Sequence, residues 1–306
     1  MSTTNAPATA NVAPPEQSGG MRLSAMAQSP RYEWLRLVMK NKAAVVSGII
    51  LIGFAIMGLL APVIAPFDPN FVNPADRLDG PSSAHWFGTD DLGRDIFSRV
   101  VYGSRVSMMV SVAVMVGATT IGSVLGLITG FYPRVDVLLM RVMDGLEAFP
   151  SILLAIAIMA AFGAAVENVI IALSLVYAPN VVRLVRSTTL MTSQELYVES
   201  ARVIGMRDMP IMYKYIFRNS LSPIIVQATF VVAYAVLAEA SLSFLGAGVP
   251  PDVPTWGSMV SAGQPRLQQA WWASVFPGIF LFVIVLAINL IGDALRDALD
   301  PRSRKR

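Results

Sequence analysis

Long stretches with few or no charged side chains alternate with polar segments along this chain, and six of them are candidates to span a membrane. A spanning helix needs about 20 mainly apolar residues, because the hydrocarbon core is about 30 Å thick and a helix rises about 1.5 Å per residue. The pattern therefore predicts an all-helical integral membrane protein with six transmembrane helices, over residues 43–67, 106–132, 137–163, 168–182, 221–245 and 273–291.

The distribution of Lys and Arg predicts the orientation of these helices, because cytoplasmic segments carry the excess of positive charge. With the N-terminus placed in the cytoplasm, 18 of the 23 Lys and Arg residues fall in inner segments. The five outer ones are Arg77, Arg94, Arg99, Arg105 and Arg266. Both termini are therefore expected to be cytoplasmic. Trp271 and Trp272 lie at the predicted outer end of the last span, where aromatic residues concentrate.

Composition supports a lipid environment. Hydrophobic residues make up 55% of the chain and charged residues only 14%, whereas soluble proteins carry about 25% charged residues. The formal net charge of +3 gives no indication of nucleic-acid binding. The chain has no Cys and one His, His85, so neither a disulfide framework nor a multi-histidine metal site is expected.

The spans and their connections predict a domain organisation. A disordered cytoplasmic tail is expected over residues 1–30, because this stretch has no apolar segment to bury. The remaining units are an N-terminal segment with the first transmembrane helix (31–67), a periplasmic loop (68–104), a five-helix core (105–295) and a basic cytoplasmic tail (296–306). Within the periplasmic loop, residues 91–102 are consistent with a short surface helix that pairs Asp95 with Arg99.

The second span carries Gly122, Gly126 and Gly130 at four-residue spacing. Small residues on one face allow two helices to approach closely. We expect this face to pack tightly, either within the chain or against a partner.

The main inner loop, residues 187–220, contains a pattern typical of two short helices. In the first, Tyr197, Ala201 and Ile204 share one face, and Gly205 is placed to end it in a left-handed conformation. The second begins near Pro210, which suits a first helical turn. An exposed pair of helices between two spans fits either a docking element or an ordinary amphipathic connector.

Four charged residues fall at membrane depth, where charges are costly and usually face protein or water. Arg141, Asp144 and Glu147 follow one another at three-residue spacing in the third span, and Pro150 is expected to kink that helix. Asp144 and Glu147 are possible pathway-lining residues, although pairing of Arg141 with Asp144 favours a structural role. Glu239 in the fifth span is a further pathway candidate, and a buried, hydrogen-bonded carboxylate is the alternative.

The inner loop resembles the EAA loop of ABC-importer permeases, in which Glu-Ala-Ala is followed four residues later by Gly. Here the residues are Glu199, Ser200, Ala201 and Gly205. Ser200 replaces the usual Ala, and Phe217-Arg218 stands where a Leu-Pro pair is usual. The resemblance implies the ABC importer type I permease fold and a coupling helix that binds an ATP-hydrolysing subunit.

Other motifs resemble the dipeptide and oligopeptide permeases of the DppC/OppC type. They lie at residues 40–52, 65–70, 85–105, 239–259 and 289–302. The resemblance implies a multi-pass subunit of the bacterial inner membrane that imports di- or oligopeptides, with glutathione or a nickel chelate as alternative cargoes. It also implies a DppB-like second permease, two ABC ATPases and a periplasmic or lipid-anchored substrate-binding protein as partners.

The chain itself is not expected to be an enzyme or to hold a cofactor. No G-x-x-x-x-G-K-[ST] sequence is present to cradle phosphates, so ATP and Mg²⁺ are expected on the partner ATPases. A self-sufficient secondary transporter is a rival interpretation, but such proteins usually carry internal repeats, and none is evident here. An intramembrane enzyme is a second rival, disfavoured by the shortage of catalytic groups.

Overall fold

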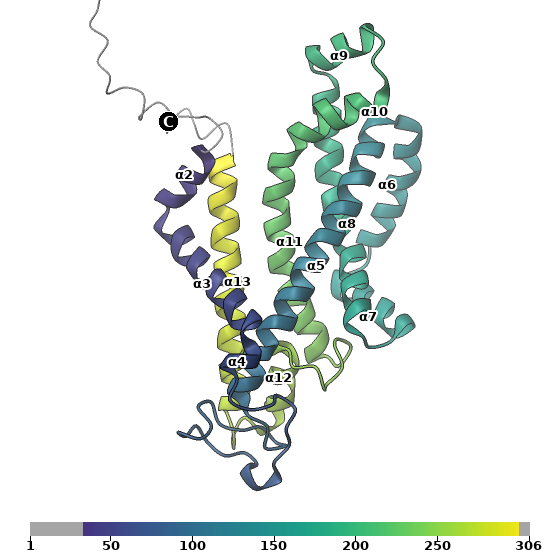
Figure 1. The fold of residues 1–306 in the computed structure, drawn as a ribbon. Helices are drawn as coiled ribbons and strands as arrows, with labels where there is room; N and C mark the ends of the chain where they lie inside the picture. Colours follow the sequence, from purple (N-terminus) through teal and green to yellow (C-terminus); the bar gives the residue numbers. More distant parts are fainter. Residues whose placement is uncertain (1–32, 300–306) are drawn as a thin grey trace, which may run out of the picture.

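A computed structural model describes residues 33–299. The predicted disordered tail at 1–30 lies outside the described residues, as do residues 300–306 of the predicted basic tail. Figure 1 shows long helices side by side, with short helices and loops at both ends of the bundle. The helices are α2 Glu33–Lys40, α3 Lys42–Leu59, α4 Ala61–Ile64, α5 Ile96–Phe131, α6 Pro133–Glu147, α7 Ser151–Phe162, α8 Val166–Ser193, α9 Leu196–Val203, α10 Asp208–Ile211, α11 Arg218–Phe244, α12 Trp256–Gly263 and α13 Trp272–Leu299.

Five helical segments of the described chain are long and apolar enough to cross a membrane. They are α3, α5, α8, the continuous segment Asp208–Phe244 and α13. The predicted third span, residues 137–163, is instead the pair α6 and α7, bent by 93° at the break between them. Counting this pair as one broken span gives the six that the sequence predicts.

The break between α6 and α7 has a local cause at Pro150. A proline has no backbone N–H to donate, and its ring disfavours helical geometry in the residue before it. Pro150 adopts an extended conformation and precedes the first residue of α7. The kink that the sequence predicts is therefore a complete interruption of the helix.

Several helices extend beyond the predicted spans. The fifth segment, Asp208–Phe244, contains α10, a π-helical stretch at Met212–Phe217 and α11 without interruption. α8 continues to Ser193, past the predicted end at residue 182, and carries Pro179 inside it. α5 begins at Ile96, so the separate surface helix expected over residues 91–102 does not form. Because α8 ends at Ser193 and the next long helical segment begins at Asp208, the inner loop is shorter than the predicted 187–220.

Tight packing joins α5 to α8, which lie side by side in Figure 1. A Cβ atom on Gly126 would lie 2.6 Å from Val185 Cβ and 2.8 Å from the Val182 carbonyl oxygen. Gly122 and Gly130 leave similarly little room, against Val181 and Thr189. The expected close approach of the glycine face is therefore confirmed, and the facing helix belongs to the same chain.

The end of the bundle that carries α4 and α12, which is the outer end in the predicted orientation, has an aromatic core around Trp256 (Figure 1). This indole is fully buried and packs against the rings of Phe54 on α3 and Phe280 on α13, at centroid distances of 5.5 and 6.3 Å. Its N–H donates to the Val100 carbonyl oxygen of α5 at 3.1 Å. These contacts fix α3, α5, α12 and α13 to one another.

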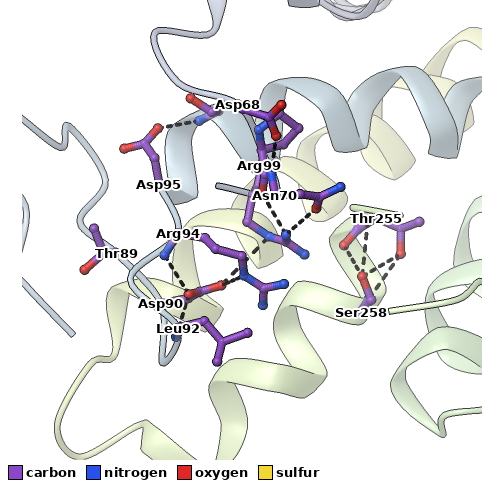
Figure 2. A network of polar contacts seen from close by, with 12 residues as sticks. Asp68, Asn70, Thr89, Asp90, Leu92, Arg94, Asp95, Arg99, Thr255 and Ser258 are labelled. Atoms are coloured by element: carbon purple, nitrogen blue, oxygen red, sulfur yellow. Dashed lines mark hydrogen bonds and ion pairs between the residues drawn. The ribbon is translucent and has the colours of Figure 1, made fainter. Parts of the chain in front are cut away.

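A buried charge network organises the loop between α4 and α5 (Figure 2). The Asp90 carboxylate accepts a hydrogen bond from Arg94 Nε at 2.7 Å and lies 3.9 Å from Arg99 Nε. Arg99 also donates to the Pro69 carbonyl oxygen at 2.9 Å. The expected Asp95–Arg99 side-chain pair is therefore replaced, because Arg99 turns towards Asp90 while Asp95 caps α5 through the Ser98 N–H.

Two further contacts tie this loop to its surroundings. The imidazole of His85 lies 2.9 Å from Asp95 Oδ1, and the indole N–H of Trp272 donates to the Thr89 carbonyl oxygen at 3.1 Å. We call residues 65–95 the outer platform. Its internal contacts and its bond to α13 hold it in one position on the outer end of the bundle.

Candidate functional site

The short helices α9 and α10 lie at the opposite end of the bundle, which is the inner end in the predicted orientation, and α9 stands beyond the ends of α5 and α6 (Figure 1). Gly205 ends α9 in a left-handed conformation, with φ +80°. Its N–H donates to the Arg202 carbonyl oxygen at 3.0 Å, and the Met206 N–H donates to that of Ala201 at 3.0 Å. This pair of bonds is the Schellman arrangement, which favours glycine at this position. The predicted C-terminal turn at Gly205 is confirmed.

One face of α9 is buried against the start of the fifth spanning segment. Val198 and Ala201 form a small apolar cluster with Ile211 and Ile216. Of Tyr197, Ala201 and Ile204, which the sequence places on one helical face, only Ala201 is buried, and Ile204 is 76% exposed.

Two side chains add directional contacts between α9 and the bundle. The Asn219 side-chain amide donates to the Tyr197 hydroxyl at 2.6 Å, and the Arg202 guanidinium lies 5.2 Å from the ring centroid of Phe131. Partial burial and the Glu195 carboxylate raise the pKa of Tyr197, against the opposing effect of the Asn219 bond. The Tyr197 phenol is therefore neutral at physiological pH. The contacts of Asn219 with Tyr197 and of Arg202 with Phe131 hold α9 in a fixed orientation on the bundle.

Five large apolar side chains of this helix pair and of the π-helical stretch that follows it are each more than 70% exposed: Leu196, Val203, Ile204, Met209 and Tyr213. We call these five the inner patch. Glu199 and Ser200 are exposed on the same helix, and the Ser200 hydroxyl donates to the Leu196 carbonyl oxygen at 2.8 Å. Large apolar side chains that are exposed at one end of the bundle are typical of a protein-binding surface.

The predicted charges of the third span form an ion-pair cluster with a residue that sequence reasoning missed. Arg183 of α8 lies 2.7 Å from Asp144 Oδ1 and 2.5 Å from Glu147 Oε2. The expected partner, Arg141, is replaced by Arg183 because α6 packs against α8. The only indication in the sequence was that Arg183 directly follows the predicted fourth span, residues 168–182.

A second inter-helix pair lies nearer the inner end. The guanidinium of Arg186 contacts both carboxylate oxygens of Asp136, at 2.5 and 2.6 Å. This bidentate contact is geometrically specific and joins α8 to α6.

A cavity of about 850 Å³ lies between α6, α7, α8, α11 and α13. Its walls carry Glu147, Tyr177, Asn180, Gln227, Tyr234 and Arg296 among apolar side chains. Of the predicted pathway residues, Glu147 lines this cavity and Asp144 does not. The volume falls in the range of about 300–1,000 Å³ typical of small-molecule sites.

Glu239 is fully buried away from this cavity. Its carboxylate accepts hydrogen bonds from the Ser243 hydroxyl at 2.9 Å and the Ser107 hydroxyl at 3.2 Å. These contacts join α11 to α5 and favour the structural alternative for Glu239. Among the described residues, no three His, Cys, Asp or Glu side chains are grouped so that they could hold a metal ion.

Two family models match the chain. One, described as the binding-protein-dependent transport system inner membrane component, covers residues 118–305. The other, described as the N-terminal TM domain of oligopeptide transport permease C, covers residues 29–81. Together they include the inner helix pair and every spanning segment except the first part of α5, since residues 82–117 lie outside both matches.

Individual proteins agree with these matches. The chain is 45% identical over 279 residues to a dipeptide transport system permease protein DppC of Alkalihalophilus pseudofirmus, covering 91% of this chain and 92% of that protein. It is 40% identical over 277 residues to a glutathione transport system permease protein GsiD of Pectobacterium atrosepticum, covering 90% and 92%. A solved structure of the MetNI methionine ABC transporter in inward-facing conformations shares the fold, with a TM-score of 0.53 and 16% identity over 66% of this chain and 96% of that chain.

Proposed function

This chain belongs to the inner-membrane components of binding-protein-dependent transport systems, in their dipeptide and oligopeptide (DppC/OppC) branch, and we propose that it forms one half of the channel of an ATP-driven importer of di- and oligopeptides. The inner patch is the observation that carries this proposal. It places five large apolar side chains where a separate cytoplasmic protein can contact them.

The proposed coupling site consists of Glu199, Ser200, Ala201 and Gly205 together with the inner patch. Ala201 anchors α9 to the bundle, whereas Glu199 and Ser200 are exposed. Gly205 sets the direction of the chain between the two helices. An ATPase that binds this surface would favour one arrangement of the spanning helices through its differential affinity for the two states.

The proposed assembly contains a DppB-like second permease, two ABC ATPases that bind ATP and Mg²⁺, and a substrate-binding protein outside the membrane. The outer platform is the proposed docking surface for that protein, because its buried charge network holds it in one position. In this arrangement the protein lies in the bacterial inner membrane with both termini in the cytoplasm, and it performs no catalysis of its own.

Peptides are the cargo that the relatives favour. DppC of Alkalihalophilus pseudofirmus is named for dipeptide transport, and GsiD of Pectobacterium atrosepticum for glutathione, itself a peptide. Glutathione is therefore the second candidate cargo, and a nickel chelate is a more distant one.

The experiment is purification of the tagged chain from its native operon in gentle detergent, followed by identification of the co-purifying proteins. We expect a second permease and two ATPases. Glu199→Arg should lose the ATPases and keep the second permease. The matched control is Glu167→Arg, the same substitution at an exposed position in the first turn of α8, which should retain both. A chain that purifies alone and moves peptide into vesicles without ATP would instead be a secondary transporter.

A further inference from the structure

The cavity between α6, α7, α8, α11 and α13 has polar groups on every side of an otherwise apolar wall. One face of α11 contributes Gln227, Phe230 and Tyr234, at spacings of three and four residues. The break at Pro150 contributes another part of the wall, since Pro150 and Ser151 also line the cavity. The interrupted span is therefore one of the elements that shape this cavity.

Glu147 brings an excess negative charge to the cavity. Arg183 contacts both Asp144 and Glu147, so one positive charge faces two negative charges in this cluster. The second carboxylate oxygen of Glu147, Oε1, is buried and has no hydrogen-bond partner in the described part of the chain. A buried, unsatisfied carboxylate oxygen favours binding of a cationic donor.

Uncharged polar groups also line the cavity. Asn180 and Gln227 present side-chain amides to the cavity, and neither amide makes a hydrogen bond within residues 33–299. A side-chain amide offers both donors and an acceptor, which is the complement of a peptide group. Tyr177 is used differently, because its hydroxyl donates to the Tyr234 carbonyl oxygen at 3.3 Å.

Arg296 of α13 supplies a positive charge at the inner end of the same cavity. The described residues provide it with no carboxylate within 4 Å. The cavity thus contains an under-neutralised anion, two amides and a cation on different helices. This arrangement complements a zwitterion with amide groups between its two charges.

We propose that this cavity binds the main chain of a short peptide in transit. Glu147 pairs with the peptide's ammonium group, Asn180 and Gln227 bond its peptide groups, and Arg296 pairs with its carboxylate. Recognition then depends on features that all short peptides share, so the cavity accepts different side chains. This inference rests on the proposed function and names the residues that would carry it out.

The test is protection of an introduced thiol in the purified complex without its binding protein. The chain has no Cys, so Phe230→Cys places a single thiol of this chain in the cavity wall. Dialanine at millimolar concentration should slow maleimide labelling of this chain several-fold. N-acetyl-dialanine amide, which carries neither charge, should not slow it. Val72→Cys on the outer platform is the control thiol, since Val72 is 48% exposed and the preparation lacks the binding protein, and its labelling should be unaffected by either compound.

Substitutions in the Phe230→Cys background then separate recognition from structure. Glu147→Gln should remove most of the protection by dialanine. Asp144→Asn removes one of the two carboxylates that share Arg183 but does not line the cavity, so it should weaken protection by dialanine less than Glu147→Gln does. Arg296→Gln should abolish the difference between dialanine and its C-terminal amide.

Three results would overturn the inference. They are equal protection by charged and uncharged compounds, equal loss of protection in Glu147→Gln and Asp144→Asn, and a thiol at position 230 that is never labelled because another chain fills the cavity. ATP-driven peptide uptake by the same preparation tests the proposed function separately. A complex that transports peptides without such protection would contradict only the cavity assignment.

Discussion

Gly126 of α5 lies so close to Val185 of α8 that a methyl group on Gly126 would stand 2.6 Å from the Val185 Cβ atom. The Val182 carbonyl oxygen closes the same space from the backbone side, at 2.8 Å. Lipid surrounds the bundle and is as apolar as its side chains, so close packing takes the place of the hydrophobic effect in joining these helices.

Gly126→Ala should therefore destabilise the protein, because the added methyl group forces α5 and α8 apart. Overpacking of this kind costs about 1–3 kcal/mol. The matched control is Gly53→Ala on α3, where a Cβ would meet no atom within 4 Å. We expect a lower unfolding temperature in detergent for Gly126→Ala alone. Equal temperatures for the two variants would contradict the packing argument.

Two isoleucines of the inner helix pair should respond oppositely to the same substitution. Ile204 is 76% exposed and Ile211 is fully buried. Ile204→Asp should leave the unfolding temperature unchanged and reduce binding of the ATPases, because it puts a charge in the inner patch. Ile211→Asp should instead lower the yield of folded protein, since a buried unpaired charge is strongly destabilising. Co-purification and thermal unfolding together distinguish these results, and a stable Ile204→Asp variant that binds the ATPases normally would remove the inner patch from the coupling site.

Combining Glu199→Arg with Gly205→Val should abolish peptide-stimulated ATP hydrolysis while the spanning helices remain folded. The first change reverses an exposed charge, and the second forces a β-branched residue into a left-handed conformation at a cost of about 1–2 kcal/mol. Gly48→Val serves as the control, because Gly48 is helical and has open space around it. Undiminished transport by the double variant would rule out the coupling assignment.

A double-mutant cycle should show that the side chains of Asp136 and Arg186 are energetically coupled. Single changes to Asp136→Ala and Arg186→Ala each remove a bidentate contact between α6 and α8. We expect a coupling energy of about 1 kcal/mol or more from denaturant unfolding, as adjacent charged partners show. A coupling near zero would mean that solvent already screens this pair.

Glu239→Ala should lower the stability of the folded protein, and its effect on transport should follow from that loss. The change leaves the hydroxyls of Ser107 and Ser243 without their acceptor in a buried region, at a cost of about 1–3 kcal/mol. Glu239→Gln, which keeps an acceptor oxygen, should recover most of the stability and the transport rate. A Glu239→Gln variant that is stable but inactive would instead support the pathway role.

Hydrophobic patterning predicted the existence of the spans well and their ends poorly. It placed the fifth span from residue 221, whereas the helix continues from Asp208, because the inner part of this helix is amphipathic and packs on α9. The same limitation hid the start of α5 at Ile96, where protein rather than lipid surrounds the helix. In both cases the sequence predicts a separate short helix, over residues 91–102 and from Pro210, where the structure has one continuous helical segment.

Local turn chemistry and small-residue spacing were more informative. Gly205 ends α9 as predicted, because the left-handed conformation depends on one residue and its immediate neighbours. The Gly122–Gly126–Gly130 face was also predicted correctly, although the sequence could not identify its partner. Long-range pairing was out of reach, as shown by Arg183, which displaced Arg141 because the folding of α6 against α8 depends on tertiary packing.

The helical segment from Asp208 to Phe244 has a mechanical consequence. Figure 1 shows that α10 and the π-helical stretch Met212–Phe217 turn away from the axis of α11, so the segment consists of a short arm and a long arm. The long arm, α11, has 27 residues and is about 40 Å long at about 1.5 Å of rise per residue. A rigid tilt of about 7° would move the far end of α11 by roughly 5 Å, the size of one helical turn. A small rotation of the short arm, which packs on α9, would thus reach the opposite end of the bundle as a change large enough to repack side chains.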